Sequence, residues 1–269
     1  MPPGPEGSLA PSREADSVSP CFSGAGGTND PATDCVRRLN FSSAYAYLPS
    51  RFWHPLKRMQ SREPVAGQIC RADHIGFFHR SRADQFSVIA PFIADGLAAN
   101  QRCLYVAHDN SVPMVLQKLN EAGVPATEAV RSGSLKLLTS RDTFLRHGVF
   151  QMDRMVDDLR EEVEAALRDG FSGLRASGEM TWALDTPAAL EQLAEYECKL
   201  HAQFPRQFIG LCQYDESRFA QSTLSDMLHL HPWVLTRGRL VRNEEMASEV
   251  AGLHSRKVLS VDDFAAAQG

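Results

Sequence analysis

Apolar segments of strand length alternate with segments of helical periodicity along most of this 269-residue chain. The short segments HIGFFH (74–79), CLYVAH (103–108) and FIGLCQYD (208–215) are nearly continuously apolar, as in strands that are buried on both faces. Residues 82–99 and 151–169 carry apolar side chains at helical spacing. Strands that alternate with helices form βαβ units. The sequence therefore predicts a three-layer α/β domain with a mostly parallel sheet and helices on both faces.

The same alternation continues through the rest of this predicted domain, which we place at residues 68–241. Pro187 follows Thr186 as a helix start, and Gly123 and Gly170 follow the ends of two expected helices. We expect further strands at 134–140 and 173–179, and further helices at 112–122, 187–204 and 217–229. Residues 242–269 are expected to form a C-terminal tail.

Residues 1–66 differ from the rest of the chain because proline, glycine and serine dominate them and no hydrophobic period is visible. Such a segment cannot bury enough apolar surface to offset the entropy of ordering, so we expect it to be disordered. An aromatic patch at 39–58 leaves two interpretations open, a docking segment or a weakly structured linker. Translation that begins at Met59 is a third interpretation of the upstream residues.

Composition excludes several classes of protein. The formal net charge of -5 offers no basic surplus for a nucleic acid held mainly by its phosphates. No apolar run is long enough to span a membrane, and the N-terminus lacks the features of a signal peptide. We therefore expect a cytoplasmic protein that binds neither membranes nor nucleic acid directly. The six cysteines are scattered without a CxxC pair, so the sequence suggests neither disulfides nor a zinc knuckle.

Polar side chains that follow the predicted strands are the candidate site residues, because ligands of such sheets bind at the carboxyl ends of the strands. Glu179 stands out, since a carboxylate just after an apolar strand is costly to bury without a partner. The other positions also have ordinary structural interpretations, such as helix capping by Asp109 or a half-buried aromatic ring at Tyr214. The candidate ligand-binding residues are His79, Arg80, Asp109, Glu179, Trp182 and Tyr214, with His108 and Asp215 as neighbours.

Known catalytic patterns fit the chain poorly. It contains no GxSxG, HExxH or GxxxxGK[ST] motif, and Cys212 lies inside a strand with no histidine at a telling spacing. A metal site built from His79, His108 and Glu179 is geometrically possible, although no spacing requires it. Residues 79–82, His-Arg-Ser-Arg, occupy a strand–helix junction that often binds phosphate, but they include neither glycine nor lysine.

Several segments together resemble the MEDS domain, a sensory domain named after methanogens and methylotrophs and also known from a dichloromethane-responsive repressor. These segments are HIGFFHR, LAANQRCLYVAHD, GLRASGEMTWAL and EYECKL…FIGLCQYD followed by HPWVL. The resemblance extends from about Ala72 to Val234. The family looks like a degenerate relative of the RecA and KaiC ATPases, which implies a RecA-like α/β fold. It also implies a sensor of small molecules such as hydrocarbon derivatives, attached to varied signalling outputs.

In the ATPase relatives, Asp109 and Glu179 would stand near catalytic or magnesium-handling acids, which implies a pocket between them. Gly76 departs from the family, which often has cysteine there, so the resemblance gives thiol-based sensing no support in this chain. The DNA-binding region of the repressor is also absent from the resemblance.

The leading hypothesis is a non-catalytic small-molecule sensor that signals through a partner such as a kinase, an anti-sigma factor or another regulator. Its pocket would be lined by His79, Asp109, Glu179, Trp182 and Tyr214. The alternative is a nucleotide-dependent enzyme of RecA/KaiC type with a non-standard phosphate loop, and a third interpretation is a scaffold with a vestigial pocket. The sequence indicates no particular cofactor.

Overall fold

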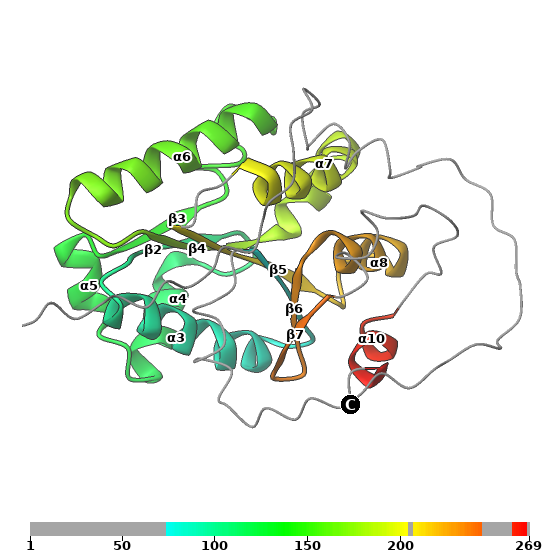
Figure 1. Cartoon of the computed structure of the whole chain (residues 1–269), viewed down its shortest axis with the longest axis horizontal. Helices are drawn as coiled ribbons and strands as arrows, with labels where there is room; N and C mark the ends of the chain where they lie inside the picture. The colour runs from blue at the N-terminus through cyan, green and yellow to red at the C-terminus, as the bar shows by residue number, and fades with distance from the viewer. Residues whose placement is uncertain (1–73, 204–206, 244–259, 268–269) are drawn as a thin grey trace, which may run out of the picture.

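The computed structural model describes residues 74–203, 207–243 and 260–267, which form an α/β fold of three layers (Figure 1). The middle layer is a seven-stranded sheet in the order β3-β2-β4-β5-β1-β6-β7. Every neighbouring pair is parallel except β6 and β7, which form an antiparallel hairpin. The predicted fold class is thus confirmed. The strands are β1 (His74–His79), β2 (Arg102–Ala107), β3 (Leu135–Thr139), β4 (Leu174–Glu179), β5 (Phe208–Asp215), β6 (Trp233–Thr236) and β7 (Arg239–Arg242).

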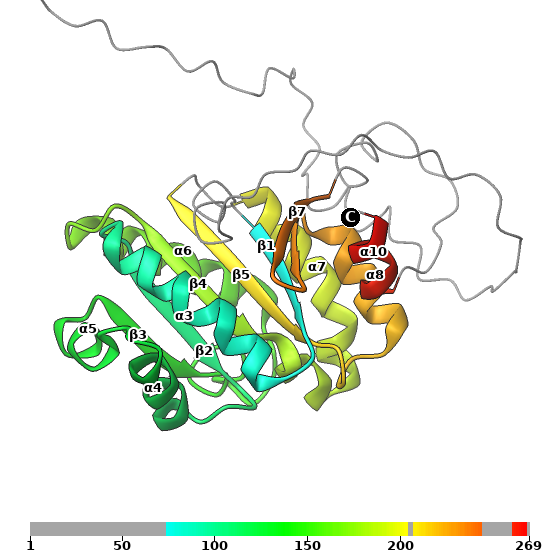
Figure 2. The same ribbon diagram turned by 90° about the horizontal axis from the view of Figure 1, so that it is seen from below.

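Helices cover both faces of the sheet (Figures 1 and 2). One face packs against α3 (Arg82–Ala98), α4 (Val112–Glu121) and α5 (Ala126–Ser132), and the other against α6 (Met152–Arg168), α7 (Pro187–Gln203) and α8 (Gln221–Leu230). The 3₁₀ helix η1 (Met180–Asp185) joins β4 to α7, and α10 (Val261–Ala267) packs against α8. Each face therefore has its own hydrophobic core.

Two switch points lie beside the central strands β4 and β5 at the carboxyl edge of the sheet. The helices that follow β1 and β2 lie on one face, whereas those that follow β4 and β5 lie on the other. Neighbouring strands β2 and β4, and likewise β5 and β1, therefore send their following loops in opposite directions. Ligands of open α/β sheets bind at such places.

The observed elements match most of the expected ones within a residue or two. The last expected helix starts later, at Gln221, because residues 216–219 form a turn held by Asp215, whose carboxylate accepts bonds from Ser217. The sequence did not predict α5, η1, the β6–β7 hairpin or α10. Within the expected tail, Val261 of α10 is buried. The N-terminal segment, including the aromatic patch, lies outside the described residues.

Two further features bear on the expectations from composition. No helix in the described part of the chain is long and apolar enough to cross a membrane. Cys198, on α7, is disulfide-bonded, whereas the sequence suggested no disulfide.

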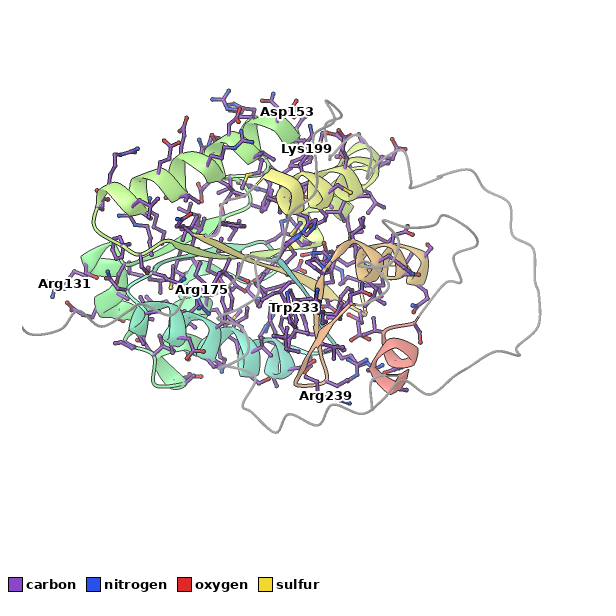
Figure 3. All side chains as sticks on the ribbon, in the orientation of Figure 1. Arg131, Asp153, Arg175, Lys199, Trp233 and Arg239 are labelled. Carbon is purple, nitrogen blue, oxygen red and sulfur yellow. The ribbon has the colours of Figure 1, made fainter. Side chains whose placement is uncertain are left out.

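Polar contacts join the sheet to one helical layer and join helices within the other layer (Figure 3). Arg175 of β4 is buried, donates from Nε to Gln101 Oε1 at 2.7 Å, and lies over the Phe92 ring. Across the other face, the Lys199 ammonium of α7 donates to Asp153 of α6 at 2.5 Å. The buried guanidinium keeps its hydrogen bonds, so its burial is tolerated.

Gly173, just before β4, packs closely against the backbone of Gln207, and this contact can be tested. A Cβ there would lie 2.3 Å from the backbone oxygen of Gln207. We expect Gly173→Ala to lower the free energy of unfolding by about 1–3 kcal/mol, because the backbone must shift to admit the methyl group. Gly178→Ala in β4 is the control, since its Cβ would make an ordinary 3.6 Å contact with Phe144. Urea denaturation measures both variants, and equal stabilities would contradict the packing described.

Candidate functional site

The carboxylate of Glu179, at the end of β4, is held by the loop that follows β2. Its Oε2 accepts the backbone N–H groups of His108, Asp109 and Asn110 at 2.8, 2.7 and 3.0 Å. Its Oε1 accepts the Tyr105 hydroxyl and the Asn110 side-chain amide, each at 2.6 Å. Consecutive N–H groups form concave anion-binding sites, and here the bound anion is a side chain of the protein itself. We call this arrangement the Glu179 clasp.

The clasp continues into a network of amide side chains. Asn110 Nδ2 donates to Gln85 Oε1 at 2.9 Å, and Gln85 Nε2 donates to Gln213 Oε1 at 2.8 Å. Gln213 Nε2 in turn donates to Ser177 Oγ at 2.9 Å, and Arg82 Nε donates to Asn110 Oδ1 at 2.9 Å. A connected network of this kind fixes the orientation of every member. It links α3 to β4 and β5.

A polar cavity of about 120 Å³ opens above this network, at the carboxyl edge of the sheet and between the two switch points. A molecule of liquid water occupies about 30 Å³, so the cavity has room for a few waters or one small organic molecule. Its lining residues are His79, Arg82, Gln85, Asp109, Asn110, Glu179, Thr181, Gln213 and Asp215.

Acidic residues outnumber basic ones in the lining of the cavity. Asp109, Glu179 and Asp215 line it together with one arginine, Arg82. Arg218, outside the lining, pairs with Asp109 at 3.0 Å. Burial lowers the pKa of His79 below its ordinary value of 6.5, although Asp215 and other acids oppose the shift. His79 is therefore mostly neutral near pH 7 and adds little positive charge. This balance favours a neutral or cationic ligand over an anion.

Two lining residues carry buried polar atoms without a hydrogen-bond partner in the described part of the chain. These atoms are Nδ1 of His79 and Oγ1 of Thr181. A buried polar group that lacks a partner costs about 1–3 kcal/mol. Both atoms belong to side chains that line the cavity but expose almost no surface to it, so a rotation of the side chain would bring either atom into contact with a bound molecule.

The phosphate position at the start of α3 is already filled by the chain. Ser81 accepts the Asp84 N–H at 3.1 Å, and the Asp84 carboxylate accepts the Arg80 N–H at 3.1 Å. The Arg80 guanidinium turns away and binds Glu216 and Asp262. An incoming phosphate would meet the Asp84 carboxylate at the helix end where free N–H groups normally hold it.

Comparison with known protein families matches residues 73–232 to the model of the MEDS family, described as the MEthanogen/methylotroph, DcmR Sensory domain. The match covers more than half of the chain. The chain belongs to the MEDS family. The resemblance inferred from its sequence segments is thereby confirmed.

The MEDS domain has a curated relative and a structural neighbour. The chain is 27% identical to the transcriptional repressor DcmR of Methylorubrum extorquens over 174 aligned residues. The alignment covers 64% of this chain and 63% of the repressor. The chain thus corresponds to less than two thirds of the repressor's length. A KaiC-like protein from Pyrococcus horikoshii OT3 is similar over 67% of this chain and 80% of that protein, with 11% identity and a TM-score of 0.46. This likeness concerns the fold and carries no functional argument.

The structure brings three of the six candidate residues of the MEDS domain together, because His79, Asp109 and Glu179 line the cavity. Arg80 lies beside the cavity but is paired with Glu216 and Asp262. Glu179 has a role that the sequence did not indicate, since both of its oxygens are occupied by the clasp.

Trp182 and Tyr214 do not join that cavity. Trp182 is fully buried and stacks on Phe144, because η1 turns its side chain toward α7. Tyr214 is also fully buried and donates to Glu197 at 2.5 Å. Successive residues of a strand face opposite sides, so Tyr214 points to one core while Gln213 and Asp215 face the cavity.

Arg82, Gln85, Asn110, Thr181 and Gln213 complete the cavity and were not predicted. Two of these residues, Gln213 and Gln85, could have been identified from the sequence pattern. Gln213 interrupts an apolar strand, and Gln85 lies on the apolar side of an amphipathic helix, where it is buried. A buried amide needs partners, so such interruptions indicate polar networks.

The metal site considered from the sequence is not assembled. His108 Nδ1 contacts Ser140 Oγ at 2.8 Å, its Nε2 faces Asp185, and the oxygens of Glu179 are occupied. In the part of the chain that the structure describes, the ligating side chains that come together are instead His74, Glu197, Cys212 and His231, on the α7 side of β5.

The clasp predicts a large effect of Glu179→Gln. The new amide NH₂ must face N–H or O–H donors, so several hydrogen bonds to a charged group are lost at once. We expect the free energy of unfolding to fall by about 2–4 kcal/mol. Glu121→Gln is the control, because Glu121 is exposed and accepts bonds only from nearby side chains of its own helix. Thermal or urea unfolding of both variants checks this, and an unchanged stability of Glu179→Gln would refute the clasp.

Proposed function

We propose that this MEDS domain is a non-catalytic sensor that binds a small polar organic molecule in the cavity at the carboxyl edge of its sheet. The single observation that carries the proposal is a polar cavity between two switch points, with unpartnered buried atoms in walls that hydrogen bonds hold in place. The sensory description of the family supports a regulatory role.

The cavity limits the chemistry of the ligand. Its volume suits a short molecule, and His79 Nδ1 and Thr181 Oγ1 offer hydrogen bonds to a hydroxyl, carbonyl or amino group. Asp109 is already paired with Arg218, so Asp215 is the lining carboxylate that suits a positive charge and disfavours phosphate or carboxylate. A hydrocarbon derivative with one hydroxyl or amino group meets these demands. A nucleotide does not, because the cavity is small and the start of α3 is filled.

An ion-pair network connects the edge of the cavity to the surface. Arg80, the neighbour of His79, binds Glu216 and Asp262, and Arg237 of the β6–β7 turn binds the same two acids. Asp262 belongs to α10. A ligand that shifts the turn between β1 and α3 would therefore change the positions of α10 and the β6–β7 hairpin. We propose that a regulatory partner protein in the cytoplasm reads this surface, without direct contact between this chain and nucleic acid.

Thr181→Val tests the assignment of the cavity. The substitution keeps the shape of the side chain and removes the unpartnered hydroxyl, so we expect folding stability to stay the same or rise slightly. Short-chain alcohols and amines are screened for a rise in the melting temperature of the wild-type protein, since a ligand of the folded state raises it. Affinity for the best compound is expected to fall about 5- to 30-fold in Thr181→Val, as loss of one hydrogen bond implies.

Thr236→Val is the matched control, because Thr236 is equally buried, also has an unpartnered hydroxyl and lies outside the lining of the cavity. It should leave the affinity unchanged. Equal affinities of both variants and the wild-type protein would place the ligand elsewhere.

Adding Mg-ATP tests the alternative of a nucleotide-dependent enzyme. Because Asp84 and Ser81 occupy the start of α3, Mg-ATP is expected to leave the melting temperature unchanged and to be hydrolysed no faster than in buffer. A rise of several degrees at millimolar Mg-ATP, or turnover above background, would support the nucleotide-dependent enzyme instead.

A further inference from the structure

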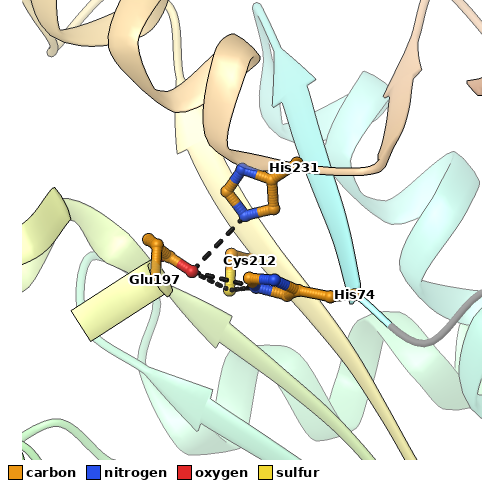
Figure 4. A group of neighbouring side chains, drawn as sticks. All are labelled: His74, Glu197, Cys212 and His231. Atoms are coloured by element: carbon orange, nitrogen blue, oxygen red, sulfur yellow. Dashed lines mark hydrogen bonds and ion pairs between the residues drawn. The ribbon is translucent and has the colours of Figure 1, made fainter. Parts of the chain in front are cut away.

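Four side chains with metal-ligating atoms meet on the α7 side of β5, outside the cavity (Figure 4). His74 begins β1, Cys212 lies in β5, Glu197 belongs to α7, and His231 follows α8. All four are buried, and their ligating atoms lie within 4.8 Å of one another. Buried polar groups are expected to have a purpose or a full set of partners.

Three distances between these atoms match the edges of a tetrahedron around zinc, and a fourth, between Glu197 and His74, is shorter. Ligands bonded to zinc at about 2.0–2.3 Å in a tetrahedron lie roughly 3.3–3.7 Å from one another. Cys212 Sγ lies 3.3 Å from Glu197 Oε2 and 3.5 Å from His74 Nε2. Glu197 Oε2 lies 3.4 Å from His231 Nε2 and 2.9 Å from His74 Nε2. Small movements of the side chains would therefore complete a four-ligand site.

The hydrogen bond of His231 to Met227 indicates which ring nitrogen of His231 carries the hydrogen and which has a free lone pair directed at the cluster. Its Nδ1 lies 2.7 Å from the backbone oxygen of Met227, and a carbonyl can only accept, so Nδ1 carries the hydrogen. In the neutral ring, Nε2 then has a free lone pair. This atom has no hydrogen-bond partner in the described part of the chain and faces the Glu197 carboxylate. Two acceptors that face each other require a cation between them, either a proton or a metal ion.

The surroundings of the cluster resemble the outer shell of a metal site. Metal-bound histidines usually donate their second N–H to a carbonyl or carboxylate, as His231 does to Met227. Nδ1 of His74 has no such partner in the described part of the chain. The other oxygen of Glu197 accepts the Tyr214 hydroxyl at 2.5 Å. Gly76 makes room for the His231 ring, because a Cβ there would lie 2.8 Å from its Cγ.

We propose that His74, Glu197, Cys212 and His231 bind one zinc ion in a closed tetrahedral site. One thiolate, one carboxylate and two neutral imidazoles form a donor set that zinc accepts, and together with Zn²⁺ they carry no net charge, which suits a buried site. The ion would join β1, β5, α7 and the segment after α8. Because all four ligands are buried, the ion enters during folding, and its binding energy adds to the stability of the fold.

The first test uses the full chain as purified, without chelators, from a zinc-containing medium. Elemental analysis by mass spectrometry is expected to find one zinc per chain, and removal of the ion with dipicolinate should lower the melting temperature. Refolding with Co²⁺ should give a thiolate-to-cobalt charge-transfer band in the near ultraviolet and the strong visible bands of tetrahedral cobalt.

Variants locate the ion. Cys212→Ser should abolish the charge-transfer band, whereas Cys103→Ser, at a buried free cysteine on β2, should leave it intact. Tyr214→Phe keeps all four ligands and should weaken zinc binding by about 10–100-fold, as loss of an outer-shell partner does. If Cys212→Ser does not fold, the cobalt spectra of the wild-type protein and Tyr214→Phe still show whether the cluster binds the metal ion.

A protein without zinc, without a cobalt band and with a melting temperature indifferent to chelator would overturn the proposal and leave a proton-sharing cluster of His, Glu and Cys. A band that survives Cys212→Ser would move the metal to another thiol. The proposal does not depend on the cavity ligand, because Thr181→Val should leave the cobalt spectrum unchanged.

Discussion

The carboxylate of Glu179 organises the functional edge of the sheet. Strands β2 and β4 are neighbours, yet the elements that follow them cover opposite faces, so their loops would diverge without a bond across the gap. Glu179 supplies that bond through five donors from Tyr105 and the loop after β2. The same loop positions Asn110, and through it the glutamines at the floor of the cavity. A single buried charge thus shapes the walls of the cavity.

This constraint also bears on what the edge can bind. An α/β sheet offers anions two kinds of place, a nest of consecutive N–H groups and the start of a helix. In this protein the nest after β2 holds Glu179, and the start of α3 holds Asp84. Both anion positions are filled by carboxylates of the chain, and the remaining cavity is rich in acids. This arrangement supports our proposal of a sensor of neutral or cationic molecules.

Periodicity and strand composition were sufficient to predict the sheet, most helices and the edge where polar residues gather. They could not predict which candidates share a wall, because that depends on the face of each strand residue and on the turn of η1. Trp182 follows β4 as Asp109 follows β2, and Tyr214 lies near the end of β5, but Trp182 and Tyr214 both face a hydrophobic core. The cluster of His74, Glu197, Cys212 and His231 has no motif of short spacing in the sequence, since its members come from β1, α7, β5 and the segment after α8. Only the fold brings them together.

The most direct test of a sensor with its ligand at the sheet edge is amide hydrogen exchange, measured with and without the best short-chain alcohol or amine. Exchange reports local opening, so a bound ligand slows it where contacts form. We predict slower exchange in segments 79–85, 108–111, 179–182 and 213–217, with a smaller effect in α10. Protection confined to α6 and α7, or none at saturating ligand, would contradict it.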